Sequence, residues 1–96
     1  MFSHVMLGAN DVEKSKSFYD AILGAIGYEP GVTDDNGRVF WMNKTGIFSI
    51  SKPIDGEPAC HGNGSTLGFS VESIEAGNAW HAAGLENGGT DCEDAP

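Results

Sequence analysis

The sequence predicts an α+β protein of one domain, built from a βαβββ module followed by part of a second module. Residues 1–52 form the first module, residues 53–64 form a linker loop, and residues 65–96 form a strand and a helix that repeat the start of the first module. Three observations predict this fold: segments in which apolar and polar residues alternate, a helical stripe of apolar residues, and an internal repeat.

The opening of the chain predicts a strand and then a helix. In "FSHVML", residues 2–7, alternation puts Val5 and Leu7 on one face of the strand and His4 on the other. Asn10 or Asp11 can cap the helix that follows, because such side chains accept hydrogen bonds from the first helical turn. The buried stripe has a spacing of three and four residues, and Gly27 is placed to end the helix in a left-handed conformation. This stripe consists of Tyr19, Ile22, Leu23 and Ile26.

Two further strands are predicted between residues 38 and 52. "RVFWMN" follows an Asn-Gly turn signal, and its alternation leaves open which face of the sheet Trp41 occupies. "GIFSISK" alternates again, and we expect Phe48 and Ile50 to face the helices. The other face of this strand then carries Ile47, Ser49 and Ser51.

The second module begins after a loop rich in glycine and proline, "PIDGEPACHGNGS". "TLGFSV", residues 66–71, alternates and predicts a strand, after which Ser73 caps a helix over residues 74–86. An offset of 62 residues aligns this strand and helix with the first pair, so that His4 corresponds to Thr66. We interpret the similarity as a duplicated module.

The charge and cysteine content of the chain indicate which partners are unfavourable and which cellular compartment to expect. Five basic residues against fourteen acidic ones give a formal net charge of −9, which argues against nucleic acid and anionic membrane surfaces as partners. Cys60 and Cys92 lack the spacing of a metal or redox motif, and we expect reduced thiols. No apolar stretch is long enough to cross a bilayer, so we expect a cytoplasmic protein.

The stretch "HVMLGANDVEKSKSFYDAILG" resembles the first strand and helix of the vicinal oxygen chelate superfamily, which includes glyoxalase I, bleomycin resistance proteins and extradiol dioxygenases. The "S-x-x-FY" and "LG" elements carry the resemblance, and "GNGSTLGFSV" is similar to the start of the second module in that superfamily. The resemblance implies modules that each curl four strands into half of a cup, with the helices outside and His4 inside. Unrelated chemistries share this scaffold, so the resemblance predicts the fold more specifically than the reaction.

In metal-dependent members, a divalent ion such as Zn²⁺, Ni²⁺, Mn²⁺ or Fe²⁺ is held by the first and last strands of each module. The resemblance places His4, Ser49 and Thr66 at three of the four ligand positions, and the fourth belongs to a strand that these 96 residues do not contain. Hydroxyl groups are poor replacements for imidazole or carboxylate ligands. His61, on the loop, is an alternative ligand.

Two functions remain open. In the first, the cup holds a small molecule without a metal, as bleomycin resistance proteins do, and five polar side chains orient it: His4, Ser49, Ser51, Thr66 and Ser70. In the second, the protein is a divalent-metal-dependent lyase, similar to lactoylglutathione lyase, or a dioxygenase, and His4 is a metal ligand. The abundance of hydroxyl groups and the shortage of anionic ligands favour the first function.

The incomplete second module also predicts association. A strand at residues 66–71 would have an open edge, and open edges and exposed apolar faces drive association. We therefore expect a homodimer, with or without exchanged elements, whose cup is lined by both chains. The alternative is a longer native chain that carries the missing strands.

Overall fold

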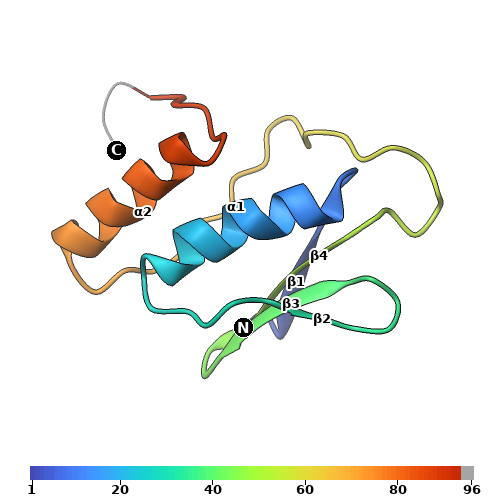
Figure 1. Ribbon diagram of the computed structural model, residues 1–96, viewed down its shortest axis with the longest axis horizontal. Helices are drawn as coiled ribbons and strands as arrows, with labels where there is room; N and C mark the ends of the chain where they lie inside the picture. The colour runs from blue at the N-terminus through green and yellow to red at the C-terminus, as the bar shows by residue number, and fades with distance from the viewer. Residues whose placement is uncertain (94–96) are drawn as a thin grey trace.

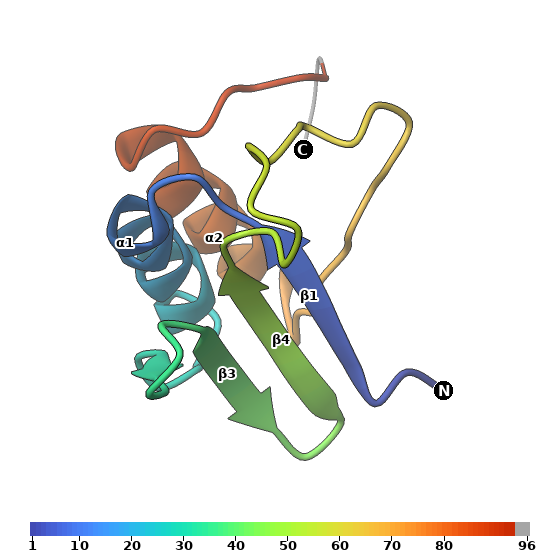
Figure 2. The same ribbon diagram turned by 90° about the vertical axis from the view of Figure 1, so that its right-hand side faces the viewer.

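The computed structural model describes residues 1–93 and contains one four-stranded sheet with helices on one side of it (Figures 1 and 2). The order of strands is β1-β4-β3-β2, with β1 parallel to β4 and the other neighbours antiparallel. The predicted α+β fold, with strands and helix in βαβββ order, is confirmed. The elements are β1 (His4–Gly8), α1 (Val12–Gly24), β2 (Val32–Thr33), β3 (Val39–Asn43), β4 (Gly46–Ser51) and α2 (Ile74–Glu86).

Helix α1 begins where its sequence predicts. The carboxylate of Asp11 accepts a hydrogen bond from the backbone N–H of Lys14 at 3.1 Å, so Asp11 is the capping residue. Asn10 instead holds the loop that follows β4, because its Oδ1 accepts from the backbone N–H of Ala59 at 2.7 Å. After α1 the chain reverses at Gly27, whose φ of 101° confirms the predicted left-handed conformation.

The core lies between α1 and the sheet. Its buried side chains come mainly from the helix, β3 and β4: Ile22, Leu23, Val39, Trp41, Phe48 and Ile50. The burial of Phe48 and Ile50 confirms the predicted inner face of β4. Trp41, whose face the alternation left open, points toward the helices and is 1% exposed. Its indole Nε1 donates to Asp20 Oδ1 at 2.9 Å, so a carboxylate of α1 satisfies the polar atom of this buried ring.

The predicted strand at residues 66–71 is wrong. This segment pairs with no strand in residues 1–93 and runs as irregular chain toward α2 (Figure 2). In the first module, β1 obtains its ladder from the parallel strand β4. Within residues 1–93, residues 66–71 have no such neighbouring strand. Alternation alone does not satisfy backbone groups, which need a partner strand.

Helix α2 has the predicted bounds and the predicted cap, since Ser73 Oγ accepts from the backbone N–H of Ala76 at 3.0 Å. It lies beside α1 (Figures 1 and 2), and from there Trp80 and Ala83 pack against the core. No residue of α2 is fully buried, so this helix covers the core from one side only. Within residues 1–93, neither helix has the length and apolarity needed to cross a membrane.

Candidate functional site

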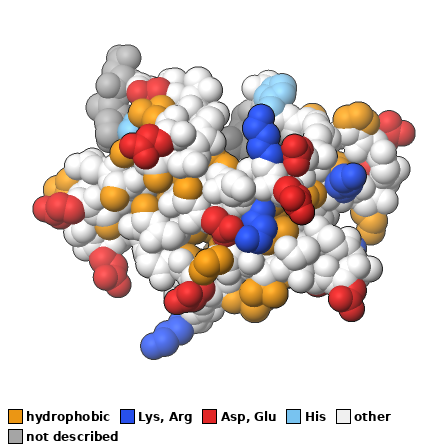
Figure 3. All heavy atoms as spheres, in the orientation of Figure 1, with side chains coloured by type: hydrophobic (Ala, Val, Ile, Leu, Met, Phe, Trp, Pro, Cys, Tyr) orange, Lys and Arg blue, Asp and Glu red, His pale blue; other side chains and the backbone are white. Residues whose placement is uncertain are grey.

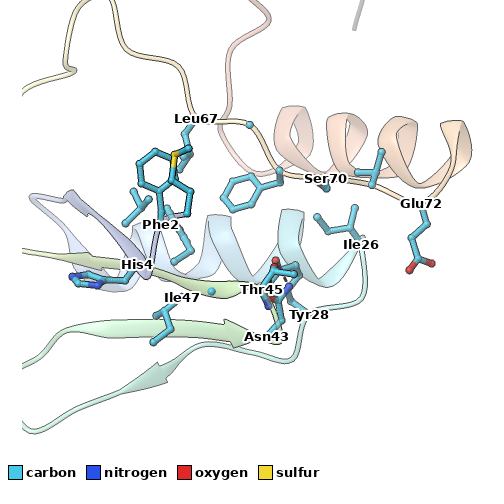
Figure 4. Close-up of a pocket in the computed structure, with 17 residues that line it drawn as sticks. Phe2, His4, Ile26, Tyr28, Asn43, Thr45, Ile47, Leu67, Ser70 and Glu72 are labelled. Carbon is cyan, nitrogen blue, oxygen red and sulfur yellow. Dashed lines mark hydrogen bonds between the residues drawn. The ribbon is translucent and has the colours of Figure 1, made fainter.

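A hollow of about 570 Å³ lies at the end of the sheet where β1 and β4 begin (Figure 4). Its walls come from the start of the chain through Val5, from Ile26 and Tyr28 after α1, from the β3–β4 turn with the start of β4, and from residues 67–72. Successive residues of a strand point to opposite faces, yet both His4 and Val5 line this hollow. It therefore wraps around the end of β1, which is an edge strand of the sheet, and we call it the edge hollow. Its volume is typical of small-molecule pockets, which measure about 300–1,000 Å³.

Most of the edge hollow is apolar. Its apolar side chains are Phe2, Ile26, Ile47, Phe48, Leu67, Phe69 and Val71. Phe69 meets the buried ring of Phe48 edge-on, with ring centroids 5.2 Å apart and an interplanar angle of 85°. This contact fastens residues 67–71 to β4 although no strand ladder does so, and aromatic pairs of this geometry contribute about 0.5–1.5 kcal/mol beyond their buried area.

His4 and Ser70 both line the edge hollow, one from β1 and the other from the segment before α2 (Figure 4). His4 is exposed, and its Nδ1 lies 2.8 Å from the hydroxyl oxygen of Ser3. Figure 4 shows the imidazole at one end of the hollow, with its ring turned away from the middle. His4 therefore lies at the rim of the edge hollow, and Ser70 lies on the opposite wall.

A cluster of polar side chains forms the other end of the edge hollow (Figure 4). Asn43 Nδ2 donates to the hydroxyl oxygen of Tyr28 at 2.6 Å, and Asn43 Oδ1 accepts from the backbone N–H and the hydroxyl of Thr45, both at 2.9 Å. These bonds hold three polar groups in fixed positions beside an apolar wall. None of these three residues was predicted as a ligand contact. The "NKTG" turn could have pointed to a hydrogen-bonded asparagine, but no local pattern indicates its contact with Tyr28.

The other predicted ligand-binding residues lie elsewhere. Ser49 is 1% exposed, and its hydroxyl donates to the backbone carbonyl of Val5 at 2.9 Å. Ser51 lies at the far end of β4 and donates to the carbonyl of Lys52 at 2.7 Å. Thr66 is exposed, just outside the stretch that lines the edge hollow. The structure thus brings His4 and Ser70 to one hollow, and the ligand contacts of all five residues stay predictions.

The residues at the predicted metal positions do not fit a divalent ion. Residues 1–93 contain no group of three or more His, Cys, Asp or Glu side chains that could hold a metal. Ser49 already donates its proton to Val5, and His61 is exposed on its loop. A single imidazole, that of His4, is left at this position, and one nitrogen donor does not make a stable site.

Two neighbouring side chains of α1, those of Tyr19 and Asp20, have shifted pKa values. Burial raises the pKa of Tyr19, which packs between Phe48 and Trp41. Burial also pushes the pKa of Asp20 upward, but hydrogen bonds from Lys16, the Gly31 backbone and Trp41 outweigh it, so this pKa lies below its usual value. These groups act on stability, since neither lines the edge hollow.

The chain has a four-stranded sheet, helices on one face of it, and a hollow around its edge strand. Its element order makes it an α+β protein of the βαβββ class. The whole chain superposes on the crystal structure of a glyoxalase/bleomycin resistance protein from Albidiferax ferrireducens with a TM-score of 0.95. The two sequences are 57% identical, and the match covers 100% of this chain and 77% of the other. No family model matches the chain, and no curated protein matches it.

Identity at this level over the full length shows common descent. The chain belongs to the glyoxalase/bleomycin resistance proteins of the vicinal oxygen chelate superfamily. The resemblance drawn from its opening strand and helix is thereby confirmed.

Proposed function

We propose that this protein binds a small organic molecule in the edge hollow, with no metal ion taking part. The observation that carries the proposal is that His4 and Ser70, predicted as ligand contacts from separate parts of the chain, line the same mostly apolar hollow. An apolar wall with a few fixed polar groups is the usual composition of a small-molecule site. In this proposal the apolar wall holds the body of the ligand, while His4, Ser70 and the Asn43 cluster orient it.

Fragment screening by two-dimensional NMR tests this proposal. A library of small organic fragments is titrated into labelled protein, and we expect the largest shifts at residues 4–5, 43–48 and 67–72. His4→Ala and Ser70→Ala should each weaken the best fragment about threefold, as expected for one lost hydrogen bond. Ser17→Ala is the matched control, because Ser17 is exposed on α1 and its hydroxyl bonds only to the Glu13 carbonyl. Shifts confined to other surfaces would refute the proposal.

We also propose that the protein forms a homodimer. The edge strand β1 has one ladder partner, β4, in the described part of the chain, which leaves its other backbone edge open. The outer face of the sheet exposes apolar side chains as well: Met6 is 41% exposed, and Val32 and Met42 are each 60% exposed. A second copy of the chain would cover both features and complete a cup over this face.

A further inference from the structure

A second hollow, of about 520 Å³, lies at the opposite end of β1 and β4. The loop of residues 53–60 forms its outer wall, so we call it the loop hollow. Much of its wall is apolar, with Met6, Leu7, Ile54 and Ala59 among the lining side chains. Asn10 ties this loop to the start of α1, since Asn10 Oδ1 accepts from the Ala59 backbone N–H at 2.7 Å. The hollow therefore has a wall that is hydrogen-bonded in place.

Two of the five basic residues of the chain line the loop hollow together. Arg38 directly precedes β3 and Lys52 directly follows β4. These strands are antiparallel, with Val39 opposite Ile50, so both cations lie at the same end of the pair. Ser51, which directly precedes Lys52, lines the same hollow.

Neither cation forms an ion pair with a carboxylate in the described part of the chain. Within residues 1–93 the ion pairs are Lys16–Asp20 and His81–Asp91, so neither Arg38 nor Lys52 has a carboxylate partner. One carboxylate, that of Asp55, lines the loop hollow, and its Oδ1 already accepts from the backbone N–H of Glu57 at 2.9 Å. The chain has a net charge of −9, and Figure 3 shows acidic side chains spread over one face, yet within residues 1–93 these two cations have no carboxylate partner.

A neighbouring hollow of about 530 Å³ shares Arg38, Ser51 and Lys52 with the loop hollow. Its lining is more polar, with Glu13, Lys16, Thr33 and Asn36. An inorganic anion could bind the two cations from either of these hollows. Of the two, the loop hollow has the apolar wall that a ligand with an apolar body requires.

We infer that the loop hollow is a second binding site, which takes an organic acid with an apolar body. The anionic group lies between Arg38 and Lys52, where charge-assisted hydrogen bonds are available, and the body lies against Met6 and Ile54. This site is separate from the edge hollow and does not rest on the proposed function there.

Cys60 provides a local readout, because it is exposed and lines the loop hollow. In a Cys92→Ser background, the rate of Cys60 alkylation by neutral iodoacetamide is followed by mass spectrometry. The probes are 2-naphthoate and its neutral analogue 2-naphthamide. We expect 2-naphthoate to protect Cys60 in a saturable way at about tenfold lower concentration than 2-naphthamide, as one charge-assisted hydrogen bond allows.

Each variant is normalised to its own alkylation rate without probe. Arg38→Gln should raise the half-protecting concentration of 2-naphthoate about tenfold, and Lys52→Gln about threefold because Lys52 is more exposed. Arg38→Lys should restore part of the loss, and Lys44→Gln, a basic residue in the β3–β4 turn, should change nothing. His4→Ala should also leave protection unchanged, which separates this site from the edge hollow. Equal protection by both probes, no protection of Cys60 by 2-naphthoate, or unchanged protection in Arg38→Gln would overturn the inference.

Discussion

Replacing Asp20 with alanine removes the carboxylate that accepts from three donors, two of which join α1 to the segment before β2 and to β3. Asp20 Oδ1 accepts from Trp41 Nε1 at 2.9 Å and from the Gly31 backbone N–H at 2.7 Å, and Oδ2 accepts from Lys16 Nζ at 2.7 Å. Trp41 is 1% exposed, so water cannot replace the lost acceptor at its ring nitrogen.

The expected cost of Asp20→Ala follows from these contacts. A buried donor left without a partner costs about 1–3 kcal/mol, and this applies in full to Trp41 and in part to Gly31. The pair with Lys16 adds at most about 0.5 kcal/mol, as is usual for helix pairs four residues apart. We expect a loss of about 3 kcal/mol, or about 12–24 °C in Tm for a domain of this size. Asp20→Asn keeps one acceptor oxygen and should lose about 1 kcal/mol.

Urea unfolding followed by circular dichroism measures these losses, with Lys16→Gln as the control for the exposed ion pair. The pH dependence gives a second test, because the pKa of Asp20 is lowered in the folded protein. A carboxyl group with a lowered pKa stabilises fully above its unfolded value, about 3.9, and this contribution is lost as pH falls through the folded value. The gap between the wild type and Asp20→Asn should therefore shrink in acid. A loss in Asp20→Ala no larger than that in Lys16→Gln would refute this reasoning.

Three other properties can be measured. Gly31→Ala should cost about 2 kcal/mol in urea unfolding, because the added Cβ would meet Trp41 at 2.6 Å and Val39 at 2.7 Å. Gly24→Ala meets nothing within 4 Å and should be neutral or stabilising, and equal losses in the two variants would contradict the packing argument. Calorimetric titration of demetallated protein with Zn²⁺, Ni²⁺ or Mn²⁺ should show only weak binding, and a stoichiometric submicromolar site that disappears in His4→Ala would restore the enzyme hypothesis. Sedimentation at micromolar concentration should show a dimer, whereas a stable, well-folded monomer would rule it out.

The parts of the fold that were predictable from sequence are those decided by neighbouring residues. Asp11 and Ser73 cap their helices through backbone groups three residues away, so a short stretch contains the whole signal. The inner face of β4 follows from alternation, because its outer face carries serines at positions 49 and 51. For the edge hollow, alternation along residues 2–7 predicts that His4 and Val5 lie on opposite faces of the strand.

The remaining features depend on contacts between distant segments. "TLGFSV" has the alternating pattern of a strand. A strand also requires a neighbouring strand to pair with, and the alternation does not predict whether one is present. The face of Trp41 was open because its neighbours Phe40 and Met42 are apolar as well. The contact of Asn43 with Tyr28 and the convergence of Arg38 with Lys52 both depend on how the chain turns between elements. Sequence patterns predict such turns without predicting what they bring together.

The parallel pairing of β1 with β4 separates the two hollows and gives them different electrostatic surroundings. Because the strands are parallel, their first residues meet at the edge hollow and their last residues meet at the loop hollow. Helix α1 connects β1 to the rest of the module, so its N-terminal end lies near the cations Arg38 and Lys52, and the chain leaving its C-terminal end reaches the edge hollow at Ile26. The helix dipole adds positive potential at the first end and negative potential at the second. Glu13 offsets part of the positive potential, yet the two unpaired cations leave the loop end the more favourable place for an acid. The proposed small organic molecule in the edge hollow and the proposed organic acid in the loop hollow are therefore compatible within one chain.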